Sequence, residues 1–300
     1  RKRKRGFNCI MDVIGGLNKN ASRMLTGFIM GTIAMFCIIK SGIALLLMLF
    51  VLVFTASKEY VKILEHKGFY PSLKVIWLAE AVFGIIAYVQ RFDLASMALT
   101  GFSILSIMWV LFKGRQPYIA NAATTILGFI YCGWLPLHLI FLRDLSSDKF
   151  SDGLGFVVML FTAVLLTDIG CYYAGRHLGK HKLAPVVSPN KTIEGSIGGA
   201  MCAVIGAMVI GAFIHVEWYI SLIIGILCTT FGQIGDLSES LIKRDAGVKD
   251  SGDTLPGQGG FLDRTGSFIF AIPVMYYFCK YFVFSDVFYH SVMNFVKGIF

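Results

Sequence analysis

Long apolar stretches with few charged residues constrain the fold of this chain more than any other feature. Hydrophobic residues make up 56% of its 300 residues and charged residues only 15%, whereas a soluble domain carries about 25% charged residues. One water-soluble core cannot bury such an excess. The sequence therefore excludes a soluble enzyme, a disordered chain and a fibrous repeat, and it predicts an all-α protein that crosses a lipid bilayer several times.

Nine apolar segments are candidates for transmembrane helices, each of which needs about 20 residues to cross the hydrocarbon. We expect a single transmembrane domain, residues 1–300, which begins with a basic cytoplasmic segment, residues 1–23. A turn at Lys40-Ser41-Gly42 is expected to separate the first two helices. The predicted helices run approximately over residues 24–39, 42–56, 73–89, 94–112, 118–142, 153–174, 196–216, 218–234 and 267–284.

The distribution of lysine and arginine predicts the orientation of the chain. With the N-terminus in the cytoplasm, 21 of the 27 basic residues fall in cytoplasmic segments and five fall outside. Cytoplasmic loops of membrane proteins carry such an excess. The net charge of +9 then fits these loops and anionic lipid better than it fits nucleic acid. The seven cysteines lie mostly in apolar runs without a CxxC pattern, so we expect neither disulfides nor a zinc site.

The first of two late polar segments covers residues 175–195 and contains the sequence SPNKTIEG from residue 188. Ser188 followed by Pro189 predicts the start of a helix, with Ser188 as its N-cap. The free amides of that helix, together with Lys191 and Thr192, would bind phosphate. The alternative is a basic loop that only sets the topology.

The second polar segment, residues 236–266, places carboxylates at the membrane boundary. In a continuous helix Asp236, Ser240 and Lys243 share one face, with Glu239 beside them. A carboxylate there is costly unless it is paired, solvated or bound to a cation. A loop rich in glycine follows and leads to Asp263 at the start of the last helix.

Two acids from two helices, flanked by basic residues, predict a site for Mg²⁺ and a polyphosphate, with Asp236 and Asp263 as the metal ligands. The alternative is a salt-bridged helix end beside a solvated loop. Asp168 lies near the cytoplasmic end of the sixth predicted helix and could face the same cavity. His138 is expected to be a packing or an interfacial residue, and Glu80 is left without an assigned role.

These two segments resemble the phosphatidate cytidylyltransferases, also called CDP-diacylglycerol synthases. The resemblance covers residues 165–268, the catalytic signature region, and is carried by Ser188–Gly195, Gly235–Leu237, Ser240–Arg244, Lys249–Asp250 and Leu255–Gly266. The chain departs from the family pattern at two positions. Gln258 stands where the family usually has histidine, and Gly266 stands where it usually has aspartate.

The resemblance implies a nucleotidyltransferase that transfers CMP from CTP to phosphatidic acid, giving CDP-diacylglycerol and pyrophosphate for phospholipid synthesis. It implies dependence on Mg²⁺ and allows a second cation. Asp236, Asp263, Lys243 and Arg264 would form the catalytic centre. The residues expected to bind substrate are Ser188, Asn190, Lys191, Thr192, Glu194, Ser240, Arg244, Lys249, Asp250, Gln258, Gly259 and Gly260.

The expected partners are CTP, phosphatidic acid and membrane lipids, a homodimer is allowed, and nucleic acid is not expected. The chain length and motif style favour a bacterial inner membrane, with the active site on the cytoplasmic side. Three alternatives stay open: a CTP-dependent polyprenol or phytol kinase, a transporter or scramblase, and an inactive homologue that has lost function through Gln258 and Gly266.

Overall fold

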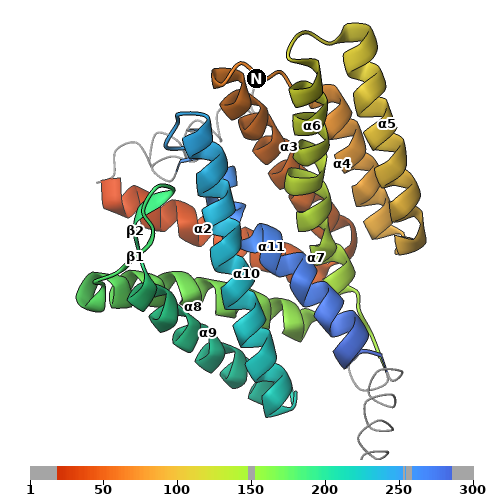
Figure 1. Ribbon diagram of the computed structural model, residues 1–300. Coiled ribbons are helices and arrows are strands. Elements are labelled where there is room, and N and C mark those ends of the chain that lie inside the picture. Colours follow the sequence, from red (N-terminus) through yellow and green to blue (C-terminus); the bar gives the residue numbers. More distant parts are fainter. Residues whose placement is uncertain (1–18, 148–152, 253, 255–258, 286–300) are drawn as a thin grey trace, which may run out of the picture.

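The computed structural model describes residues 19–147, 153–252, 254 and 259–285 (Figure 1). The described part of the chain is helical, apart from one antiparallel β-hairpin and the connecting loops. The N-terminal helices are α2 (Lys19–Lys40), α3 (Gly42–His66), α4 (Leu73–Tyr88), α5 (Ala95–Lys113), α6 (Tyr118–Gly128) and α7 (Leu135–Arg143). A π-helical segment, Phe129–Trp134, joins α6 and α7 into one long apolar rod.

The second half contains the hairpin and the remaining helices. Its elements are α8 (Leu154–Leu178), β1 (Lys182–Ala184), β2 (Ser188–Thr192), α9 (Ile193–Phe213), α10 (Trp218–Asp245) and α11 (Leu262–Phe278), followed by a π-helical turn, Cys279–Val283. Figure 1 shows α4, α5 and α6 on one side of the molecule, α8 and α9 on the other, and α10 and α11 between them. The hairpin projects from the ends of α8 and α9.

Seven helical segments within the described residues are long and apolar enough to cross a membrane, which confirms an all-α protein with several spans. Two of the nine predicted segments are shorter: α4 has 16 residues, and the apolar part of α2 covers Gly27–Lys40. The count of nine spans and the orientation therefore stay predictions. The predicted turn at Ser41 is confirmed, because α2 ends at Lys40 and α3 begins at Gly42.

Two sets of polar contacts mark opposite ends of the helices. At one end, Asp144 accepts hydrogen bonds from Ser41 Oγ at 2.9 Å and from Gln90 Nε2 at 3.0 Å. These contacts bring together the turn after α2, the turn after α4 and the end of α7. At the other end, Lys67 after α3 forms an ion pair with Asp245, the last residue of α10. Segments predicted to face the same side of a membrane thus lie together.

Two buried polar residues within the helices contact nearby side chains, His138 within its own helical segment and Glu80 across to α3. His138 is buried and packs against Trp134 with ring centroids 4.5 Å apart, which confirms its expected packing role. Glu80 is also buried, and its Oε2 accepts a hydrogen bond from Ser57 Oγ at 3.2 Å.

Candidate active site

The first polar segment folds as a hairpin, which corrects the predicted start of α9. Ser188 lies in strand β2, which pairs with β1 through Ala184, and Pro189 is part of that strand. The N-cap is Thr192, whose Oγ1 accepts a hydrogen bond from Gly195 N at 3.1 Å. Proline is tolerated in a two-stranded hairpin because its missing N–H need not leave a partner unpaired. The Ser-Pro pattern is therefore consistent with both structures.

A pocket of about 250 Å³ lies where α8, the hairpin, the start of α9 and α10 meet. Its two carboxylates come from different helices, Asp168 from α8 and Asp236 from α10. Asp236 forms an ion pair with Lys191. The lining residues are Asp168, Cys171, Tyr172, Leu183, Asn190, Lys191, Thr192, Gly195, Ser196, Gln233 and Asp236. Asp168 thus faces the same cavity as Asp236, as predicted.

Glycine residues allow the helices around this pocket to approach closely. A Cβ on Gly195 would lie 2.9 Å from the carbonyl oxygen of Cys171, so α9 could not pack on α8 at this distance with a larger residue. On the other side Gln233 forms a hydrogen bond with Ser196. This bond fixes α10 against the start of α9, and Gln233 Nε2 also donates to Thr229 Oγ1 at 3.0 Å within α10.

A second polar cluster lies further along α10, where α11 begins. Lys243 Nζ is 2.7 Å from Glu239 Oε1 and 2.7 Å from Asp263 Oδ1. Asp263 Oδ2 also accepts hydrogen bonds from Gly260 N at 2.9 Å and from Ser251 N at 3.0 Å. The side chain of Glu239 is 1% exposed, and its Oε2 is buried without a hydrogen-bond partner among the described residues.

Charge interactions connect the pocket with this cluster. Asp168 interacts with Asp236, and Lys191 and Arg264 are the nearby positive charges. Glu239 in turn interacts with both Asp236 and Asp263. Carboxylates with neighbouring basic groups form a donor set that suits Mg²⁺, which takes one or two carboxylates plus phosphate oxygens. Within the part of the chain that the structure describes, no three His, Cys, Asp or Glu side chains come together as a metal site, so the Mg²⁺ site stays a prediction.

Several predicted substrate-binding residues form contacts within the fold. Glu194 accepts hydrogen bonds from Lys180 N at 3.0 Å and from His181 Nδ1 at 2.6 Å, so it closes the base of the hairpin. Arg244 donates to Val248 O at 3.1 Å just after α10. Asn190 lines the pocket and Ser240 is half-buried on α10, whereas Lys249 and Asp250 are exposed in the loop after it.

The glycine-rich loop holds the remaining predicted positions. Gly259 has a φ of +86°, a backbone conformation that favours glycine. Gly260 lies against Asp263, as described above, and Gln258 lies outside the described residues. At Gly266, a Cβ would meet the carboxylate of Glu239, so Glu239 fills the space that an aspartate at this position would need.

Sequence reasoning missed Glu59, a buried residue of α3 whose carboxylate contacts the loop between α10 and α11. The predicted helix ends at residue 56, whereas α3 continues to His66 and buries Glu59, so the local sequence offers no clear signal for this residue. It also missed Gln233, which lines the pocket one helical turn before Asp236. The partners of Glu59 lie about 200 residues away, so no local pattern identifies them.

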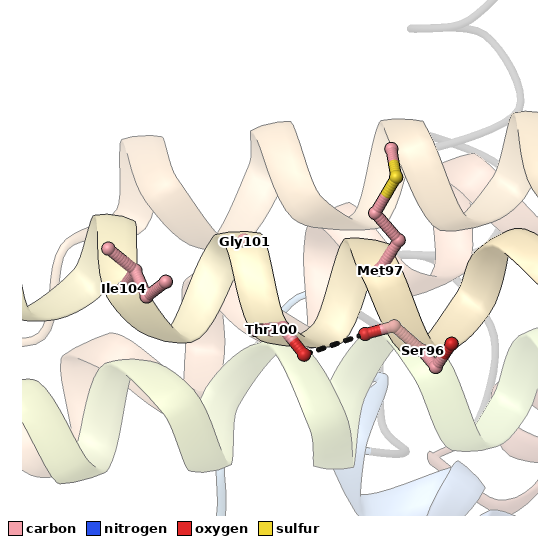
Figure 2. Close-up of a pocket in the computed structure, with 5 residues that line it drawn as sticks. All are labelled: Ser96, Met97, Thr100, Gly101 and Ile104. Carbon is pink, nitrogen blue, oxygen red and sulfur yellow. Dashed lines mark hydrogen bonds between the residues drawn. The ribbon is translucent and has the colours of Figure 1, made fainter.

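A separate hollow of about 430 Å³ lies on the surface of α5 (Figure 2) and is lined by Ser96, Met97, Thr100, Gly101 and Ile104. All of these residues come from one helix and none is charged. Thr100 Oγ1 donates to Ser96 O within the helix at 2.9 Å. The hollow offers no group that could neutralise a phosphate, so the pocket beside Asp236 is the candidate active site.

Comparison with known proteins identifies the family. The model of the cytidylyltransferase family matches residues 21–282. The chain belongs to the cytidylyltransferase family. Its relatives include a phosphatidate cytidylyltransferase of Staphylococcus saprophyticus, 37% identical over 84% of this chain and 96% of that protein. Similar proteins of the same printed name occur in Staphylococcus epidermidis, at 37% identity, and Staphylococcus aureus, at 36%, with the same coverage. Family membership thus extends beyond the signature region into the N-terminal half.

Proposed function

We propose that the protein transfers CMP from CTP to phosphatidic acid, giving CDP-diacylglycerol and pyrophosphate. Membership of the cytidylyltransferase family and the names of its relatives support this reaction. The observation that carries the proposal is the pocket between α8, the hairpin and α10, where Asp168, Asp236 and Lys191 meet. A membrane-embedded protein with a charged pocket near the ends of its helices can bind a lipid phosphate and a water-soluble nucleotide together.

The chemistry requires charge neutralisation and alignment more than a strong base. A phosphate oxygen of phosphatidic acid attacks the α-phosphorus of CTP, the bond to the bridging β-phosphate oxygen breaks, and pyrophosphate leaves. A phosphate monoester is largely ionised near neutral pH. Lys191 and Arg264 would bind phosphate oxygens, and Lys243 would hold Asp263 in place. Positioning of the reacting groups then lowers the barrier.

Mg²⁺ would be held by Asp236 and Asp263, with Asp168 as a further carboxylate in the pocket that Asp236 lines. When bound, it supplies positive charge to the reacting phosphates. Chelation with EDTA should therefore stop the reaction, and added Mg²⁺ should restore it. Full activity in EDTA would contradict this part of the proposal.

We place the site on the cytoplasmic side of a bacterial inner membrane, with nine spans and the N-terminus inside. Lys67 after α3 pairs with Asp245 at the end of α10, and Lys191 of the hairpin pairs with Asp236 on the same helix. The predicted cytoplasmic segments 58–74, 176–191 and 243–264 together carry 12 of the 27 Lys and Arg residues. A cytoplasmic site would have direct access to CTP. Successive connections between the helices alternate between the two polar ends of the molecule, as this topology requires.

The test uses purified full-length protein in vesicles that contain phosphatidic acid, with CTP labelled at either the α- or the γ-phosphate. Label from the α-position should enter the lipid and label from the γ-position should leave in pyrophosphate. With a polyprenol or phytol also present in the vesicles, a lipid kinase would transfer the γ-label to that alcohol instead, and lipid flux without CTP would indicate a transporter or scramblase. An inactive homologue would transfer neither label.

A further inference from the structure

Glu59 of α3 is buried, with 4% of its surface exposed, and its carboxylate contacts the loop that leads into α11. Oε2 accepts hydrogen bonds from Ser251 Oγ at 2.9 Å and from Leu262 N at 3.0 Å. Oε1 accepts from Thr254 Oγ1 at 2.5 Å and from Phe261 N at 3.1 Å. Each oxygen therefore receives one hydroxyl group and one backbone N–H.

The same loop is also held by Asp263. Ser251 joins the two carboxylates, because its Oγ donates to Glu59 and its N donates to Asp263 Oδ2 at 3.0 Å. Gly260 also donates its N–H to Asp263. A Cβ on Gly260 would lie only 2.7 Å from Glu59 Cδ, so glycine allows the loop to approach Glu59. The two carboxylates thus bind the same short segment.

The backbone groups bound by Glu59 lie at the N-terminus of α11, which begins at Leu262. The first amides of a helix have no partner within the helix and attract anions. Glu59 supplies an anion from within the protein, so these amides are already satisfied. Asp263 and Arg264 lie in the same first helical turn, and their positions depend on how that turn is held.

We infer that Glu59 is a positioning residue for the proposed site. Its buried carboxylate fixes the loop and the first turn of α11, so that Asp263 and Arg264 keep the geometry that transfer to phosphate requires. The inference rests on the proposed function. It gives α3, which lies outside the signature region, a role in the reaction.

Glu59→Gln is a sharp test because it keeps the size of the side chain and removes one acceptor. Whichever way the amide is oriented, its NH₂ faces one hydroxyl and one backbone N–H. The hydroxyl can rotate and accept a hydrogen bond, but the backbone N–H cannot, so one buried donor loses its partner. The variant therefore disturbs the loop without leaving a cavity.

The experiment compares purified Glu59→Gln with Glu65→Gln, which alters an exposed glutamate on the same helix. We expect Glu59→Gln to lower kcat about tenfold and to change KM for CTP less than about twofold, since displaced catalytic groups mainly affect turnover. Hydrogen exchange of peptides covering residues 251–265 should become faster. Glu65→Gln should match wild type in kcat and in exchange.

A second control separates positioning from loss of stability. Phe83 is fully buried in α4 among other aromatic residues, and Phe83→Leu should lower Tm without changing the loop. If Phe83→Leu at a similar Tm loses as much kcat as Glu59→Gln, the role of Glu59 is only structural and the inference is wrong.

Wild-type kcat and exchange in Glu59→Gln would also overturn the inference, while leaving the proposed function intact. A wild-type protein that transfers no CMP would instead overturn the proposed function. The comparison of Glu59→Gln with wild type tests the inference, and the transfer assay on wild-type protein tests the proposed function. The two measurements therefore distinguish failure of one from failure of the other.

Discussion

Three carboxylates near the signature region are stabilised by different partners. Asp236 forms an ion pair with Lys191, and Asp263 is held by Lys243 and two backbone amides. Glu59 is bound by hydroxyl and backbone N–H groups. A buried carboxylate needs such partners because its desolvation is costly. Of the three, Asp236 has the most exposed side chain, at 34%, and lines the pocket. It is therefore the carboxylate most accessible to a ligand.

Asp236→Asn should reduce CMP transfer at least about 100-fold, because it removes a charge that the proposed site uses directly. The matched control is Asp245→Asn, nine residues further along the same helix, where the side chain is 58% exposed and pairs with Lys67. A surface ion pair contributes little to stability, so this control should keep activity within about twofold. The measurement is transfer of α-label from CTP to lipid; similar activity in both variants would contradict the role of Asp236.

Gly266→Ala should lower both stability and activity, because the new Cβ would meet the buried carboxylate of Glu239 and lie 3.2 Å from its Cβ. Overpacking of this kind costs about 1–3 kcal/mol, and a displaced Glu239 would disturb Lys243. Gly101→Ala on α5 is the control, since a Cβ there has no neighbour within 4 Å. Thermal unfolding in detergent measures the difference. An unchanged Tm for Gly266→Ala would show that Glu239 moves without cost.

At the scale of elements, the apolar helices could be predicted because a bilayer leaves the backbone few alternatives. The hairpin could not. Ser188-Pro189 fits a helix start as well as a short strand, and the pairing of Lys182 with Thr192 depends on contacts that a local pattern does not contain. The resulting fold places Lys191 on a strand beside α10, where it reaches Asp236.

The cap at Thr192 gives a test of this corrected boundary. Thr192→Val keeps the shape of the buried side chain but removes the oxygen that accepts from Gly195 N. Loss of an N-cap costs about 0.5–2 kcal/mol, so Tm should fall, and KM for CTP should rise as the hairpin loosens. Thr192→Ser retains the hydroxyl and should keep most of the Tm. Equal Tm values for the two variants would show that the cap contributes nothing.

At the scale of the whole molecule, the sequence names Asp236 and Asp263 as candidate site residues because both fall within residues 236–266, and their shared metal site stays a prediction. Glu59 could not be identified in this way, since its contacts cross from α3 to residues 251–262. Helix length also helps to position the site. At about 1.5 Å per residue, Asp236 lies roughly 27 Å from the start of α10, close to the far side of a hydrocarbon layer about 30 Å thick.

The two polar ends of the molecule predict the result of a labelling experiment in intact cells. Lys182 lies in the hairpin beside the pocket, whereas Arg91 lies in the turn after α4, next to Gln90 and Asp144 at the opposite end. With the site in the cytoplasm, Arg91→Cys should react with a membrane-impermeant maleimide from outside, above the labelling of wild type. Lys182→Cys should react only after the membrane is permeabilised, because its thiol faces the compartment that holds CTP. The reverse pattern would invert the topology and place the pocket away from the nucleotide, and labelling of both positions from outside would mean that they do not lie on opposite sides of the membrane.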